Sequence, residues 1–113
     1  MDKYIEERPW GNFERFTDNE ISTVKLLNVK PNSKLSYQFH HKRDEFWRVI
    51  DGKGFIILND KEIEVKKGDE FFIPRETKHR IFTKDDNLTI LEISFGEFDE
   101  NDIVRIEDDY GRS

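Results

Sequence analysis

The feature that most constrains the fold is a series of short apolar runs that recur roughly every 8–12 residues, separated by Gly, Pro, Asn or Asp. Short strands at this spacing are typical of a β-sandwich or a small barrel. Alanine, the best helix former, is absent, whereas β-branched and aromatic residues are abundant. We therefore expect an all-β fold. The runs cover residues 11–16, 21–30, 35–40, 45–50, 54–58, 62–66, 69–74, 79–83, 88–95 and 102–106.

Four local signals refine this expectation. The pair Asn59-Asp60 lies between two alternating runs and predicts a tight hairpin turn. Gly52 predicts a turn that ends the strand at 45–50, and residues 99–102 are compatible with one helical turn. The segment 102–106 alternates like a strand, and the first ten residues carry no clear signal.

Composition limits the class of protein. A chain of 113 residues predicts a single domain over residues 1–113, and Leu, Ile, Val and Phe make up 33 residues, enough to form a core. Cysteine is absent, which excludes disulfides and thiolate zinc sites. A net charge of −6 with scattered basic residues argues against a nucleic-acid partner. No apolar run approaches a membrane span or a signal-peptide core, so we expect a cytoplasmic protein without a membrane partner.

The histidines and nearby polar residues predict a metal site. Period-2 alternation places Gln38 and His40 on the same face of a strand, and Glu45 opens the next strand. If those two strands are neighbours, the Glu45 carboxylate can reach the same point as His40. His79 opens another strand after a turn.

The donor types in this group suit one divalent metal ion. Two imidazoles, a carboxylate and an amide oxygen favour Zn, Mn, Co, Ni or Fe, and four protein ligands leave open positions for a substrate. Gln38 is the weakest donor and could instead orient a metal-bound water. The alternative is a hydrogen-bonded polar patch without an ion, which is costly to bury unless its groups are paired.

The same residues resemble the two motifs of the cupin superfamily. In the first motif Asn32 stands at the first Gly position, Gln38 at the first His position, and His40, Glu45 and Gly52 are in register. In the second motif Gly68, Pro74 and His79 match, while Glu76 and Thr83 stand where Gly and Asn are usual. The resemblance implies a cupin double-stranded β-helix, which is a jelly-roll barrel.

Within the cupins, the chain is similar to the type II phosphomannose isomerases. The stretch from Gln38 to Trp47 matches their Gln-x-His-His-His-Arg-x-Glu-His-Trp pattern, except that Lys42 and Phe46 replace histidines. Family members usually carry a mannose-1-phosphate guanylyltransferase domain as well; this sequence holds none, so we expect no guanylyltransferase activity. Further matches are Arg8 to Gly11, Ile73-Pro74, His79-Arg80, Glu100 to Arg105 and Glu107 to Arg112.

The resemblance implies a metal-dependent interconversion of mannose 6-phosphate and fructose 6-phosphate through a cis-enediolate. This reaction needs a base close to the carbon-bound proton. The base could be Glu45 or a residue of the closing signature such as Asp108 or Asp109, whereas alternation turns Tyr37 away from His40.

The substrate phosphate needs cationic partners, preferably arginines. Arg105 is the strongest candidate because it lies inside an alternating apolar run, and we include it with Glu45 and Asp108 among the catalytic residues. Trp47 either stacks on the sugar or closes the barrel floor. The residues that we expect to bind substrate are Arg43, Trp47, Arg80 and Arg112.

Other functions stay open at this stage. A cupin that binds a sugar without catalysis needs no base, and an isomerase or epimerase could act on another sugar phosphate or nucleotide sugar. A cupin oxygenase is a third alternative, although Gln38 in place of a histidine makes a poorer Fe(II) site. Small barrels commonly hide their edge strands by pairing, so we also expect a homodimer.

Overall fold

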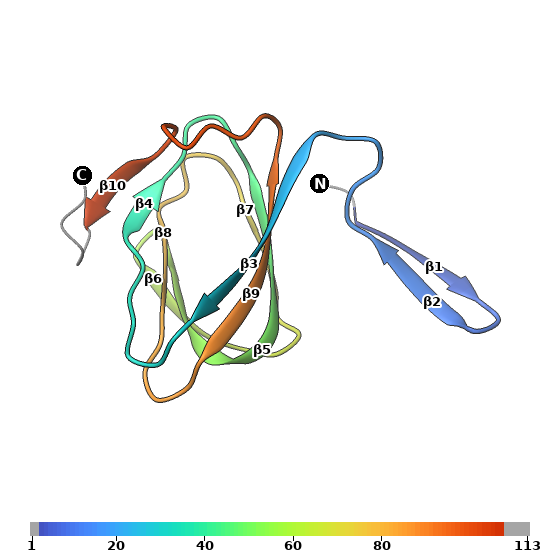
Figure 1. Ribbon diagram of the computed structural model, residues 1–113, viewed down its shortest axis with the longest axis horizontal. Helices are drawn as coiled ribbons and strands as arrows, with labels where there is room; N and C mark the ends of the chain where they lie inside the picture. The colour runs from blue at the N-terminus through green and yellow to red at the C-terminus, as the bar shows by residue number, and fades with distance from the viewer. Residues whose placement is uncertain (1–2, 108–113) are drawn as a thin grey trace.

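The computed structural model describes residues 3–107, which form ten β-strands and no helix (Figure 1). Because no helix is present in that range, none is long and apolar enough to cross a membrane. The all-β prediction is therefore confirmed. The strands are β1 (Tyr4–Arg8), β2 (Gly11–Arg15), β3 (Ser22–Val29), β4 (Tyr37–Phe39), β5 (Glu45–Leu58), β6 (Lys61–Lys66), β7 (Glu70–Ile73), β8 (His79–Phe82), β9 (Leu88–Phe95) and β10 (Val104–Glu107).

Strand β5 joins the two layers of the barrel. Its first half pairs with β7 and β9, and β3 adds to β9 at the edge of that layer. Its second half pairs with β6 and β8, followed by β4 and β10 in the other layer. All of these pairings are antiparallel, and the strands curl around a common interior (Figure 1).

The turn expected at Gly52 is wrong, because the chain continues through this residue as one strand. The ladder with β9 shifts register between Val49 and Asp51, and Gly52 has a φ of 84°. A Cβ at Gly52 would lie 1.9 Å from the backbone oxygen of Asn87, so only glycine fits there. The bulge and the glycine bend β5 from one layer into the other.

The other turn predictions had mixed outcomes. Asn59 and Asp60 have φ values of 46° and 68°, the conformation of a tight hairpin turn, as predicted. Residues 99–102 form a single turn, closed by the N–H of Asp102 donating to the carbonyl of Asp99 at 3.0 Å, and not a helix. The strand expected after this turn is present as β10.

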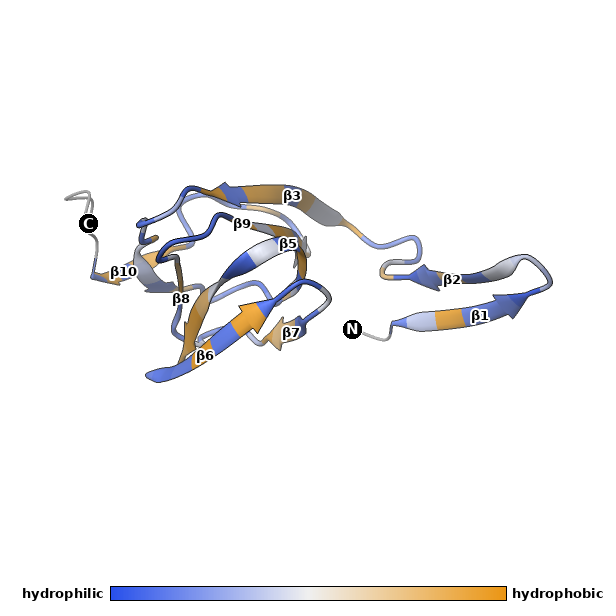
Figure 2. Cartoon of the chain, turned by 90° about the horizontal axis from the view of Figure 1, so that it is seen from below, coloured by the Kyte–Doolittle hydropathy of each residue, from blue (hydrophilic) through white to orange (hydrophobic). Residues whose placement is uncertain are grey.

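The first ten residues, which carried no clear signal, begin a hairpin. Strands β1 and β2 pair only with each other among the described residues and project away from the barrel (Figures 1 and 2). At the base of the hairpin, the rings of Phe16 and Phe46 lie 5.3 Å apart, and Lys3 forms an ion pair with Glu70 at 2.8 Å. The side chain of Trp10 at the tip is 73% exposed.

The core fills the interior between the two layers and supports the site from below. It contains the inward-facing residues of the long strands, in the alternation expected for a sheet with one buried face. Trp47 and Val49 follow Glu45 along β5, so the apolar core lies next to the polar residue that begins this strand. The buried core residues are Val29, Trp47, Val49, Ile56, Val65, Ile73, Ile81, Leu88 and Ile90.

Candidate metal centre

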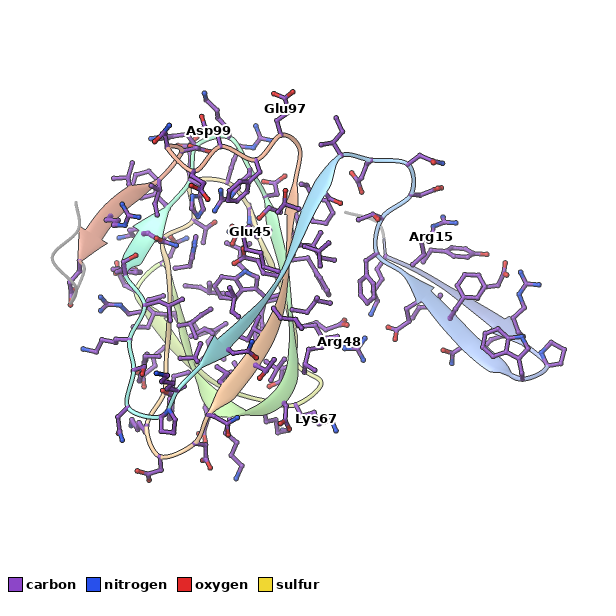
Figure 3. The ribbon with its side chains drawn as sticks, in the orientation of Figure 1. Arg15, Glu45, Arg48, Lys67, Glu97 and Asp99 are labelled. Atoms are coloured by element: carbon purple, nitrogen blue, oxygen red, sulfur yellow. The ribbon has the colours of Figure 1, made fainter. Side chains whose placement is uncertain are left out.

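Three buried side chains from three segments converge inside the barrel. His40 follows β4, Glu45 is the first residue of β5, and His79 is the first residue of β8. One ligand atom from each lies within 4.8 Å of the others, and Figure 3 shows Glu45 inside the barrel. Strand β8 lies between β4 and β5, so those two strands are not direct neighbours. The three side chains nevertheless converge as predicted, because β8 carries His79 between the strand that precedes His40 and the strand that begins at Glu45.

Both imidazoles are held in the tautomer that a metal ligand requires. His40 donates from Nδ1 to the carbonyl of Asp102 at 2.6 Å, and His79 donates from Nδ1 to the carbonyl of Thr77 at 3.0 Å. Each Nε2 therefore carries a lone pair, and these atoms lie 3.6 and 3.9 Å from the carboxylate oxygens of Glu45. Burial lowers the pKa of both His40 and His79, which keeps the rings neutral.

Two further side chains hold the Glu45 carboxylate. Arg43 donates from Nε to Oε2 at 3.0 Å, and Trp47 donates from Nε1 to Oε1 at 3.1 Å. The indole of Trp47 also meets the ring of His79 edge-on at 5.3 Å and is only 1% exposed. This placement makes Trp47 a core residue that orients Glu45, and it leaves the indole no open face on which a sugar could stack.

The residues fit a divalent cation. Two neutral imidazoles and one carboxylate are a common donor set for transition metals, and the hydrogen bonds at Nδ1 preset the geometry. The guanidinium of Arg43 also donates from Nη2 to Nε2 of His40 at 3.1 Å. An ion at that nitrogen needs the same lone pair, so metal binding requires this contact to open. Gln38 accepts a hydrogen bond from Ser36 at 2.7 Å and lies in the wall beside the three ligands.

A pocket of about 650 Å³ lies beside this centre and has His40 in its wall. Its wall combines three cationic side chains, Lys25, Arg43 and Arg105, with the carboxylates of Glu92 and Glu100. Mixed charges of this kind suit a polar, anionic ligand, because the cations can bind its charge while the carboxylates accept hydrogen bonds from its hydroxyl groups. The remaining lining residues are Leu27, Leu35, Gln38, His40, Phe98, Asn101 and Ile103.

Glu92 is the most unusual group in the pocket wall. It lies on β9 opposite Trp47 of β5 and is 8% exposed. Burial, followed by the negative charge of Glu45, raises the pKa of Glu92 to about 7. The carboxyl group is thus able to exist in either protonation state near neutral pH.

The structure brings together some of the predicted site residues and separates others. Arg43 and Arg105 line the pocket, as does Gln38. Arg80 instead donates to the carbonyl of Leu35 and to the side chain and carbonyl of Glu107, so its guanidinium ties β10 to the barrel. Its expected contact with substrate is not supported by this geometry. Asp108, Asp109 and Arg112 lie outside the described residues.

Sequence reasoning missed three residues of the site. Asp102 accepts hydrogen bonds from the backbone N–H groups of His41 and Lys42 at 2.9 and 3.0 Å. These bonds hold the backbone of the loop that follows His40. Nothing in the sequence context of Asp102 marks this role. Lys25 and Glu92, in contrast, are charged residues inside alternating apolar runs, the same signal that singled out Arg105.

The fold is that of the cupins. The structure is similar to a cupin protein from Bacteroides fragilis, with a TM-score of 0.62 and 24% identity over 69% of this chain and 70% of that chain. A cupin-like protein from Thermotoga maritima gives a TM-score of 0.65 with 22% identity, over 77% of this chain and 65% of that one.

Residues 3–108 match the family model described as mannose-6-phosphate isomerase C-terminal, and the chain belongs to this family, as its motifs indicated. It is 35% identical over 108 residues to the alginate biosynthesis protein AlgA of Pseudomonas aeruginosa, covering 94% of this chain and 22% of that protein. It is also 35% identical over 107 residues to a mannose-1-phosphate guanylyltransferase of Klebsiella pneumoniae, covering 93% of this chain and 23% of that protein. The chain therefore spans less than a quarter of these relatives.

Proposed function

We propose that the protein is a metal-dependent aldose–ketose isomerase that interconverts mannose 6-phosphate and fructose 6-phosphate. The observation that carries the proposal is the cluster of His40, Glu45 and His79 beside a pocket that His40 lines and that has cationic residues in its wall. Membership of the mannose-6-phosphate isomerase C-terminal family supports this choice of substrate.

The three clustered side chains would hold the ion, and Gln38 stands beside them. When bound, a divalent cation supplies Lewis-acid stabilisation of the negative charge that develops on the sugar oxygens O1 and O2. Zn, Mn, Co, Ni and Fe all accept this donor set. Arg43 and Trp47 keep the Glu45 carboxylate in its orientation from opposite oxygens.

Cations in the pocket wall would bind the substrate phosphate. Arg105 extends from β10, and Lys25 extends from β3, where its Nζ lies 4.3 Å from the ring centroid of Phe98. An arginine fork and an ammonium group can together neutralise a phosphate dianion. Arg43 adds positive charge but is committed to Glu45, so we assign phosphate binding to Arg105 and Lys25.

The two residues that replace histidines of the family pattern, Lys42 and Phe46, lie outside the cluster of candidate ligands. Phe46 is buried against Phe16, on the opposite face of β5 from Glu45. Lys42 has an exposed side chain, and its backbone N–H donates to Asp102. The missing imidazoles therefore do not remove a donor from the triad, which supports the proposed activity.

The test is an isomerase assay of the purified full chain with a panel of aldose phosphates, with and without EDTA, after loading with each candidate metal. We expect activity on mannose 6-phosphate that EDTA abolishes and that metal restores. In deuterated water, an enediolate mechanism should place deuterium at C1 or C2. A metal-loaded protein that binds the sugar phosphate but exchanges no hydrogen would contradict the proposal and favour a sugar-binding cupin.

A further inference from the structure

The isomerisation proposed above needs a group that moves a proton between two adjacent carbons. Three acidic residues near His40, namely Glu45, Asp102 and Glu100, are poorly placed for that task. Both oxygens of Glu45 accept hydrogen bonds, from Arg43 and Trp47, and the carboxylate faces the two histidines as a candidate ligand. The oxygens of Asp102 accept from two backbone N–H groups. Glu100 is exposed in the loop before β10.

We infer that Glu92 is the catalytic residue that takes the proton from one sugar carbon and returns it to the next. The inference rests on the proposed isomerase function and deepens it. Glu92 lies on β9 with its side chain in the wall of the pocket that contains His40 and Arg43. It also lines a small second cavity together with Gln38 and His79, so it shares a cavity with one of the candidate metal ligands.

The location of Glu92 on a central strand supports this role. Strand β9 is paired on both sides, with β3 and with β5, and the register places Glu92 between Lys25 and Trp47. The backbone at this position is therefore fixed relative to Glu45, which opens β5. A proton-transfer group needs such a rigid support, because the reacting atoms must approach within hydrogen-bond distance.

The chemistry balances with Glu92 as the only proton carrier to carbon. The carboxylate takes the proton from C2 of mannose 6-phosphate, the C2–H electron pair forms the C1=C2 bond, and the C1=O pair moves onto O1. The protonated Glu92 then delivers the proton to C1 while C2=O forms, and the O2 proton passes to O1. No oxidant or reductant is needed.

The experiment compares Glu92→Gln with the wild-type chain. Glutamine keeps the shape of the side chain but removes the carboxylate, and Glu62→Gln on the exposed face of β6 serves as a matched control. Thermal melting checks that each variant is folded. For each we measure metal content by elemental analysis, binding of mannose 6-phosphate by calorimetry, isomerase turnover, and deuterium incorporation into the sugar.

We expect Glu92→Gln to bind metal and mannose 6-phosphate within about threefold of wild type, while kcat and deuterium incorporation fall by at least about 100-fold. Glu92→Asp should recover part of the activity. Exchange within tenfold of wild type in Glu92→Gln would overturn the inference while leaving the isomerase function intact. Loss of the metal would also overturn it, because Glu92 would then be a ligand. Absence of exchange in the wild-type chain itself would refute the isomerase function together with the inference.

Discussion

At the residue scale, burial of the Glu92 carboxyl group couples its protonation to folding. Its pKa is about 7 in the folded protein against an ordinary value of 4.5, so the folded state disfavours the charged form. Well below pH 4.5 neither state is ionised at this residue. As the pH rises toward 7 the unfolded chain loses the proton first, and the folded protein loses stability relative to it.

Glu92→Gln should therefore become progressively more stable than wild type as the pH rises from 4 to 8. The difference in free energy of unfolding should grow by roughly 3 kcal/mol over this range. Denaturant titrations with EDTA present measure it, and the exposed Glu62→Gln variant should show no comparable trend. Taking the difference between variants removes the contribution of His40 and His79, whose lowered pKa values destabilise the fold as the pH falls through 6.5. A difference that stays constant with pH would contradict this prediction.

His79→Ala should abolish metal binding. The side chain supplies the only donor from β8, and the cluster without it retains one imidazole and one carboxylate. We expect the affinity for the metal to fall by more than the roughly 10–100-fold that is typical when only a hydrogen-bond partner of a metal ligand is lost. Elemental analysis and metal titration measure this, with His41→Ala as the control because its side chain is exposed. Unchanged stoichiometric metal in His79→Ala would refute the ligand assignment.

Arg105→Ala should weaken substrate capture while leaving the metal in place. Removing a hydrogen bond to a charged group costs about 1.5–3 kcal/mol, so we expect the KM for mannose 6-phosphate to rise roughly 10–100-fold. The affinity for inorganic phosphate, measured by competition, should fall by a similar factor. An unchanged KM would show that the phosphate binds elsewhere in the pocket.

At the element scale, the turn between β7 and β8 contains a strained residue. Glu76 has a φ of 67° at a position where cupins usually have Gly, and its backbone N–H donates to the carbonyl of His40 at 2.6 Å. A left-handed conformation costs a residue with a side chain roughly 1–2 kcal/mol, whereas glycine adds some entropy to the unfolded chain.

Glu76→Gly should accordingly raise the free energy of unfolding by about 0.5–1 kcal/mol, while Glu76→Ala should give no gain because it keeps the strain. Thermal and denaturant melts of the two variants provide the comparison. Equal stability of the alanine and glycine variants would show that the φ angle carries no cost here.

The sequence predicted the elements whose signal is local and missed those that depend on distant partners. The strands of the barrel follow period-2 alternation, and the Asn59-Asp60 turn follows from two residues. The bend at Gly52 depends on the close approach of Asn87, which lies far along the chain. Glu92 interrupts an apolar run, but it lies outside the family motifs, and only the folded chain brings it to the same cavity as His79.

At the scale of the whole molecule, one edge of the barrel is incompletely covered. Within the described residues β3 pairs only with β9, and its outward-facing Val24 and Leu26 are each 58% exposed. Ile21 before the strand is exposed as well. A long apolar edge strand of this kind invites pairing with another chain.

We propose that the protein forms a homodimer in which a second copy covers this edge. Sedimentation at micromolar concentration should give twice the 13.6 kDa mass of the chain. Leu26→Lys should shift the mass toward the monomer, whereas Glu62→Lys on β6 should leave it unchanged. A wild-type mass close to that of the monomer would contradict the proposal.

The continuous path of β5 also determines how the barrel can open. This single strand forms ladders with β6, β7, β8 and β9, so it belongs to both layers. Neither layer can separate without breaking the pairing of β5 in the other, and the barrel should behave as one cooperative unit. The amide protons of β5 should then exchange with solvent only through global unfolding, while those of the projecting β1–β2 hairpin should exchange through far less costly local openings.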